Sequence, residues 1–210
     1  MAKFPEPPPL AVLAGVAPDI RILAEGTRVW RIYFSAGAHP TTWNEFRSFG
    51  PTSARFDHHL PPPSVQERKV LYGAIGEKAA VTTIAEVFQA TRVVERAFRS
   101  PAWVAFDVGR DVRLLDLMGA WPTRAGASMA VSSGVRARSR RWSQAIYDAF
   151  PDVDGLVYPS SMHAGTPCVA LYERAEAAVP KNPMFHRQLL DPIALTLLKN
   201  ACREVGYLLQ

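Results

Sequence analysis

Three polar side chains lie inside short apolar segments that are far apart in this chain, and their types suggest the chemistry it can perform. They are Arg31 in WRIYF, Glu86 in TTIAEVF and Ser160 in GLVYPSS. Burying a cation, an anion or a hydroxyl beside apolar neighbours is costly unless each group finds a partner. We therefore expect the three side chains to meet in one polar cleft, as is typical of a catalytic or ligand-binding site.

The segments around Arg31 and Glu86 predict the elements that must position them. Residues 27–34 alternate as a strand does, which places Arg31 and Tyr33 on the same face. The segment EKAAVTTIAEVFQA has apolar residues at helical spacing, with Glu86 opposite the apolar stripe. The connection over 35–63 is rich in turn formers, and its length favours a functional loop.

The remaining apolar segments predict further strands. VLYGA, residues 70–74, indicates a short strand. WVAFDV and VRLLDLM predict two strands joined by a tight hairpin at residues 109–111. GLVYPSS and PCVALYE are the last pair of strand candidates.

Two more helices are expected in the second half of the chain. The first runs through RARSRRWSQAIYDAF, with Ser132 or Ser133 as its cap and with Trp142, Ile146 and Phe150 on its buried side. The second covers about 192–205 and begins after Asp191 with a proline at its first position. Its predicted buried residues are Ile193, Leu197, Leu198 and Ala201.

These elements predict a single α+β domain. Strands and helices mix without regular alternation and without a Gly-rich strand-to-helix turn, which argues against a doubly wound sheet. A chain of 210 residues with 48% hydrophobic content is long enough for one sizeable core. We divide it into a proline-rich N-terminal arm and lead-in, residues 1–26, and a domain over 27–210. The arm is open to two interpretations, a partner contact or a disordered segment.

Composition limits the compartment and the partners. The two cysteines, Cys168 and Cys202, show neither disulfide-framework nor metal-type spacing, which is typical of the reducing cytosol. No segment approaches the roughly 20 apolar residues that span a bilayer, so we expect neither signal peptide nor membrane anchor. The formal charge of +5 suits a phosphate-bearing ligand, nucleic acid or solubility alone.

The order of motifs resembles the RES-domain family, which is named for its Arg, Glu and Ser. The resemblance covers about 28–175. The motifs that carry it are WRIYF with Arg31, SARFD with Arg55, VLYGA with Tyr72, AEVF with Glu86 and DGLVYPSS with Ser160.

The resemblance implies a fold related to ADP-ribosyltransferases and a cytoplasmic toxin of a bacterial toxin–antitoxin module. It further implies that NAD is the substrate, that the nicotinamide–ribose bond is cleaved, and that ADP-ribose passes to phosphate or water. The implied protein partner is an antitoxin with a helix-turn-helix domain. A protein ADP-ribosyltransferase and a RES-like binding module without catalysis remain as alternatives.

The resemblance also assigns the phosphate and nicotinamide contacts. Arg31, and with it Arg55, suits the pyrophosphate of NAD, because a guanidinium offers a forked pair of charge-assisted hydrogen bonds. Tyr33 and Tyr72 are the candidates for an aromatic face against the cationic nicotinamide.

Glu86 and Ser160 are then left for the reacting ribose. A carboxylate near the anomeric carbon, or bonded to the 2′-hydroxyl, stabilises the positive charge that develops as the bond breaks, and Glu86 is the candidate. Ser160 is expected to hydrogen-bond the ribose or the nicotinamide amide rather than to act as a nucleophile, because no G-x-S-x-G elbow surrounds it.

Other interpretations of the same residues are weaker. The basic run Arg136, Arg138, Arg140 and Arg141 is more typical of a solvated helix face than of a nucleic-acid contact, so we expect no direct nucleic-acid binding. His58 and His59 with His163 lack metal-ligand spacing, so no metal is expected. A hydrolase built on Ser160 and His163 lacks a recognisable acid partner.

Overall fold

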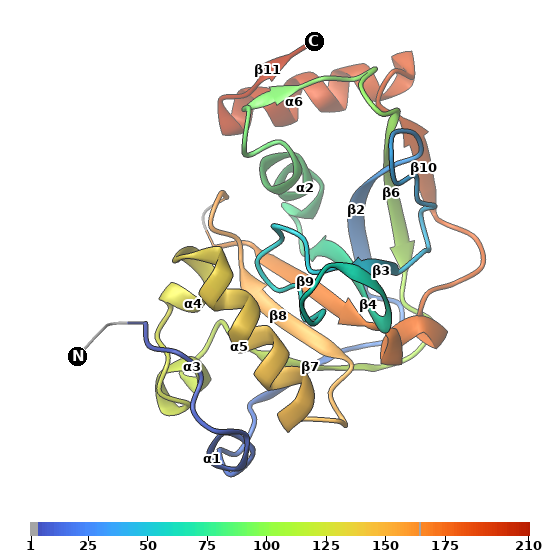
Figure 1. Cartoon of the computed structure of the whole chain (residues 1–210). Helices are drawn as coiled ribbons and strands as arrows, with labels where there is room; N and C mark the ends of the chain where they lie inside the picture. The colour runs from blue at the N-terminus through green and yellow to red at the C-terminus, as the bar shows by residue number, and fades with distance from the viewer. Residues whose placement is uncertain (1–3, 164) are drawn as a thin grey trace.

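The computed structural model describes residues 4–163 and 165–210, which form a bent, nine-stranded mixed sheet with helices on its outer faces (Figure 1). The strand order is β1-β7-β8-β9-β4-β2-β6-β10, and β3 pairs with β4 beside this path. The strands are β1 (Ile20–Leu23), β2 (Arg28–Phe34), β3 (Arg47–Gly50), β4 (Ser64–Ile75), β6 (Pro101–Asp107), β7 (Val112–Asp116), β8 (Gly155–Pro159), β9 (Pro167–Tyr172) and β10 (Phe185–Gln188). A separate two-stranded sheet joins β5 (Val93–Val94) to β11 (Leu208–Leu209).

The helices are α1 (Leu10–Ala14), α2 (Ala79–Val87), α3 (Trp121–Arg124), α4 (Ala130–Ser133), α5 (Arg136–Ala149) and α6 (Leu195–Val205), with 3₁₀ turns η1 (Glu173–Ala178) and η2 (Pro192–Ala194). Helices form at the three predicted positions, as α2, α5 and α6, and the short helices α1, α3 and α4 were not predicted. The α+β prediction is confirmed. No helix formed by the described residues is long and apolar enough to cross a membrane.

The predicted hairpin between β6 and β7 is wrong, although both strands exist. β6 pairs with β2 and β7 pairs with β1, and the register continues unchanged from Leu23↔Val112 to Arg28↔Asp107. Backbone hydrogen bonds around Val108 bridge the two halves at this corner. Residues 109–111 therefore form a bend within one long antiparallel ladder and not a hairpin turn between β6 and β7. The sheet folds over on itself at this bend.

A second feature of the sheet is the early separation of β2 from β4. The two strands pair only at Val29↔Ile75 and Trp30↔Ala74. Beyond that point β2 continues along β6 as far as Phe34↔Pro101, while β4 continues along β9 and β3. The sheet is split between the later part of β2 and the earlier part of β4, and this split leaves room for a cavity.

Helix α5 covers one outer face of the sheet, beside β7, β8 and β9 (Figure 1). Its predicted buried residues Trp142, Ile146 and Phe150 are confirmed, and they join the core on that face. The predicted serine cap is wrong. Both serines lie in the short helix α4, and α5 begins after Val135 without a side-chain cap, because Gly134 separates the two helices in extended conformation.

Helices α2 and α6 pack together against β2 and β6 (Figure 1). The last helical segment begins after Asp191 with a proline at its first position, as predicted, and Asp191 also caps it by accepting a hydrogen bond from the Ile193 backbone. The predicted burial is partly wrong, because Ile193 is 70% exposed and Leu197 is 48% exposed, whereas Leu198 and Ala201 are buried. The segment starts as a 3₁₀ turn with three residues per turn, which shifts the apolar stripe.

The described part of the lead-in, residues 4–26, packs on the domain and does not extend from it. Phe4 and Leu13 belong to the core under α5, and residues 20–23 form the edge strand β1. The Trp142 indole donates a hydrogen bond to the Pro5 carbonyl. The first residues of the predicted arm, 1–3, lie outside the described residues, and the division at residue 26 stays a prediction.

Candidate functional site

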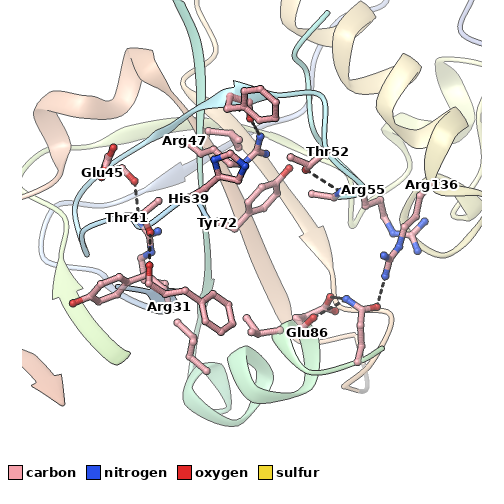
Figure 2. A pocket seen from close by; sticks show the side chains of 18 of the residues that line it. Arg31, His39, Thr41, Glu45, Arg47, Thr52, Arg55, Tyr72, Glu86 and Arg136 are labelled. Atoms are coloured by element: carbon pink, nitrogen blue, oxygen red, sulfur yellow. Dashed lines mark hydrogen bonds between the residues drawn. The ribbon is translucent and has the colours of Figure 1, made fainter. Parts of the chain in front are cut away.

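A cavity of about 520 Å³ occupies the split between β2 and β4. Its walls come from β2, the long connection around β3, the C-terminal end of α2 and the start of α5 (Figure 2). The predicted site residues among its lining are Arg31, Tyr33, Arg55, Tyr72 and Glu86. The volume lies within the usual range of small-molecule sites.

Arg31 is a buried cation without a carboxylate partner among the described residues. Its Nη1 donates to the backbone carbonyls of Trp43, at 3.0 Å, and Glu45, at 3.3 Å, while its Nε has no partner. Burial lowers the pKa of Arg31 to about 10, so the guanidinium stays charged at neutral pH. Because an unpaired buried cation is costly, this side chain is suited to receive an anion at the cavity wall.

Glu86 reaches the cavity from the last turn of α2, opposite the helix face that packs in the core. Its Oε1 accepts a hydrogen bond of 2.6 Å from the Ser160 hydroxyl, and this contact joins two of the three residues from which the chemistry was inferred. Tyr207 supports the same turn by donating to the carbonyl of Ala85, at 2.9 Å. The carboxylate is therefore held in a defined orientation.

Ser160 is buried behind Glu86 and uses all of its hydrogen-bonding capacity within the protein. Its hydroxyl donates to Glu86 and accepts from the backbone N–H groups of Met162, at 3.1 Å, and His163, at 3.0 Å. A serine hydroxyl has one donor and two acceptor positions, so none is left for a ligand. The neighbouring Ser161, rather than Ser160, lines the cavity.

Arg55 lies on the wall formed by α4 and α5. Its Nη1 donates to the Gly134 carbonyl, at 2.6 Å, and the Ser139 hydroxyl, at 3.3 Å. Burial and the nearby charge of Arg136 lower the pKa of Arg55, while Glu86 opposes the shift. Arg31 and Arg55 thus approach the cavity from different walls, as Figure 2 shows.

The two predicted tyrosines both line the cavity, with different environments. The Tyr33 hydroxyl is 2.7 Å from Nε2 of His186, so its ring is held in place by a residue of β10, two strands away from β2 in the sheet. Tyr72 is more deeply placed: its hydroxyl is buried without a hydrogen-bond partner, and burial raises its pKa. An unpartnered hydroxyl at a cavity wall can donate to a polar ligand.

Several cavity residues have no counterpart among the predictions, and they include Arg47, Gln89, Arg99, Arg136 and Ser161. WNEFRSFG places Arg47 among aromatic residues as WRIYF places Arg31, and that pattern is the signal by which it could be found. Arg136 belongs to the basic run interpreted as a solvated face. Two members of that run, Arg138 and Arg141, pair with Glu6, but Arg136 lines the cavity.

The structure also decides the alternatives that involve histidine. His58 and His59 are buried, with His58 stacked on Tyr147, whereas His163 bonds to Thr82 and Glu204. The hydrolase interpretation is wrong, because the hydroxyl of the serine donates to a carboxylate and not to an imidazole. Across residues 4–163 and 165–210, no group of three or more His, Cys, Asp or Glu is placed to hold a metal ion.

The fold and the cavity together define an α+β protein whose split sheet holds an arginine-rich cleft that includes the oriented carboxylate of Glu86. Residues 28–191 match the RES domain, so the chain belongs to the RES domain family, and the resemblance stated from the motifs is confirmed.

A similar solved structure is a chain in the crystal structure of the M. tuberculosis MbcT-MbcA toxin-antitoxin complex. It is 16% identical to this chain, with a TM-score of 0.55, and the match covers 91% of this chain and 96% of that chain. This likeness supports the same fold. No curated protein matches this chain significantly.

Proposed function

We propose that this protein is a RES-type toxin that cleaves the nicotinamide–ribose bond of NAD and transfers ADP-ribose to water or phosphate. The observation that carries the proposal is the pairing of a held carboxylate, Glu86, with an unpaired buried cation, Arg31, in one cavity. Membership of the RES family supports NAD as the substrate.

NAD fits the side chains that lack partners. Its pyrophosphate can pair with the Arg31 guanidinium, and its other polar groups can pair with polar side chains such as Tyr72 and Ser132 that also line the cavity. The tyrosine rings, Tyr33 and Tyr72, offer aromatic faces for the flat, cationic nicotinamide. Each charge-assisted hydrogen bond contributes about 1.5–3 kcal/mol net.

Glu86 acts on the reacting ribose. When the bond between the anomeric carbon and the nicotinamide nitrogen breaks, its electron pair leaves with nicotinamide, and positive charge develops on the ribose. The carboxylate stabilises that charge more strongly in the transition state than in the ground state, which is the condition for catalysis. Oxygen from water or phosphate then bonds to the anomeric carbon, and a proton is released.

The direct test is to incubate the purified chain, folded and without a bound antitoxin, with NAD in the presence and absence of inorganic phosphate. We expect release of free nicotinamide, and analysis of the second product distinguishes ADP-ribose from its 1-phosphate. Glu86→Gln is the matched control, isosteric and uncharged. If NAD binds but no nicotinamide appears under either condition, the enzyme proposal fails and the non-catalytic binding module replaces it. ADP-ribosylated protein as the sole product would indicate the transferase alternative.

We also propose a cytoplasmic toxin role and an antitoxin partner with a helix-turn-helix domain. The similar fold in a toxin-antitoxin complex supports this part of the proposal. Expression of the wild-type chain in a bacterium is expected to stop growth as intracellular NAD falls, while Glu86→Gln is tolerated. Unchanged growth with constant NAD would remove the toxin role.

A further inference from the structure

Glu86 has a second set of contacts, at the oxygen that Ser160 does not bind. Just beyond the end of α2, Nε2 of Gln89 donates to the backbone carbonyl of Glu86, at 2.6 Å, and lies 3.4 Å from its Oε2. Oε1 of Gln89 accepts a 2.6 Å hydrogen bond from Nη2 of Arg136, the first residue of α5. Figure 2 shows Glu86 and Arg136 on the same side of the cavity.

Arg136 determines which end of the Gln89 amide faces Glu86. A guanidinium carries only donors, so it can bond only to the amide oxygen. The amide NH₂ group must then point toward Glu86, where one hydrogen meets the carbonyl left unpaired at the helix end and the other approaches the carboxylate. Without Arg136 the amide could rotate and place its oxygen against the carboxylate.

We propose that Gln89 and Arg136 are positioning residues that orient the Glu86 carboxylate, with Arg136 acting through Gln89. The proposal rests on the proposed function, because it assigns a role to Glu86 in NAD cleavage. It adds two residues from outside the Arg-Glu-Ser set and connects helix α5 to the reacting centre.

The charges and titratable groups that face Glu86 come from several elements. Arg55 and Arg136 are the cations on the wall beside α5, and both line the cavity. Tyr158 on β8, Cys168 on β9 and Tyr207 after α6 are neutral at pH 7, because burial raises their pKa values. A carboxylate introduced at position 89 would therefore be a new anion close to Glu86.

The first experiment is a double-mutant cycle on NAD turnover. Gln89→Met and Arg136→Met keep similar volume but remove the polar contacts, and each is expected to lower kcat about tenfold with KM changed less than about threefold. The double variant should be no slower than the slower single variant, because both changes break the same chain of contacts. Additive losses, or a loss expressed in KM alone, would mean that Arg136 binds the ligand directly and would overturn the proposal.

The second experiment needs no turnover, so it separates this proposal from the proposed function. Gln89→Glu keeps a partner for Arg136 but places a carboxylate beside Glu86, and the like charge should move the titration of the Glu86 carboxyl to higher pH than in wild type. Carbon-13 NMR follows that carboxyl, assigned by the loss of its signal in Glu86→Gln. An unchanged titration midpoint would show that Gln89 does not face Glu86.

Arg140→Met is the matched control for both experiments. Arg140 lies one turn further along α5 and, among the described residues, makes no side-chain hydrogen bond or ion pair. We expect wild-type kcat and an unchanged Glu86 titration. If wild-type protein releases no nicotinamide but Gln89→Glu still shifts the titration, the proposed function fails while the orientation of Glu86 by Gln89 stands.

Discussion

Replacement of Ser160 by alanine tests whether this side chain binds the ligand or orients Glu86. Its hydroxyl gives a 2.6 Å hydrogen bond to the Glu86 carboxylate and has no free position for a ligand. A hydrogen bond to a charged group contributes about 1.5–3 kcal/mol. If that contribution is realised in the transition state, Ser160→Ala lowers kcat roughly 10- to 150-fold and leaves NAD affinity within about threefold of wild type.

The same change has a second, independent effect on stability. The N–H groups of Met162 and His163 lose their acceptor, at 3.1 Å and 3.0 Å in the wild type. The expected loss is about 1–2 kcal/mol of unfolding free energy, or a melting temperature lower by about 2–8 °C for a chain of this length. Circular dichroism melting measures this effect separately from the loss of activity.

The assay is steady-state nicotinamide release together with NAD binding by calorimetry. Ser161→Ala is the matched comparison, because Ser161 lines the cavity and its hydroxyl can reach a ligand. We expect Ser161→Ala to weaken NAD binding with little change in kcat, the reverse of Ser160→Ala. If Ser160→Ala instead weakens binding and leaves kcat unchanged, Ser160 contacts the ligand and the positioning role is refuted.

Three further predictions concern the roles and the core. Glu86→Gln should lower kcat about 100-fold or more with little loss of NAD affinity, whereas Arg31→Ala should raise the dissociation constant of NAD about 10- to 100-fold. If turnover and calorimetry show instead that Glu86→Gln weakens binding and Arg31→Ala lowers kcat, the two roles are exchanged. Burial lowers the pKa of His58, although a nearby carboxylate opposes the shift, so below about pH 6.5 the unfolded chain binds more protons than the folded chain and stability decreases as the pH is lowered. Urea unfolding at pH 5–8 should show this loss of stability at the acidic end in wild type and not in His58→Phe. Phe4→Ala should lower the free energy of unfolding by about 3 kcal/mol because the ring is buried, whereas Glu6→Gln should lower it by less than about 1 kcal/mol because its ion pairs are half exposed. Equal losses of stability in chemical denaturation would contradict the described packing of the lead-in.

Local periodicity was enough to predict the elements that carry the site. The alternation through Arg31 and the helical spacing through Glu86 both reflect one buried face, which a short window of sequence contains. Pairing between strands is not a local property. The segment after Val108 has the composition of a hairpin turn, and only the partners β1 and β2, far away in the chain, make it a bend.

The contacts of individual side chains were harder to predict for the same reason. Nothing in GLVYPSS indicates that two backbone N–H groups after Ser160 turn back to its hydroxyl, which leaves Ser161 as the serine that lines the cavity. Arg136 looked like its basic neighbours because a run of charges carries no information about which member begins the helix. Its inward direction depends on the packing of α5 across the sheet.

The balance of charge inside the cavity, rather than the net charge of the chain, defines the kind of ligand it suits. The charged residues that line the cavity are five arginines and two glutamates: Arg31, Arg47, Arg55, Arg99, Arg136, Glu45 and Glu86. Among the described residues, Arg47 is the one of these that forms an ion pair, with the buried Asp57 at 2.8 Å. Arg31 and Arg55 are bonded to neutral carbonyl and hydroxyl groups, which do not cancel their charge. A monoanion would leave most of this charge uncompensated, whereas a pyrophosphate brings two negative groups at adjacent positions.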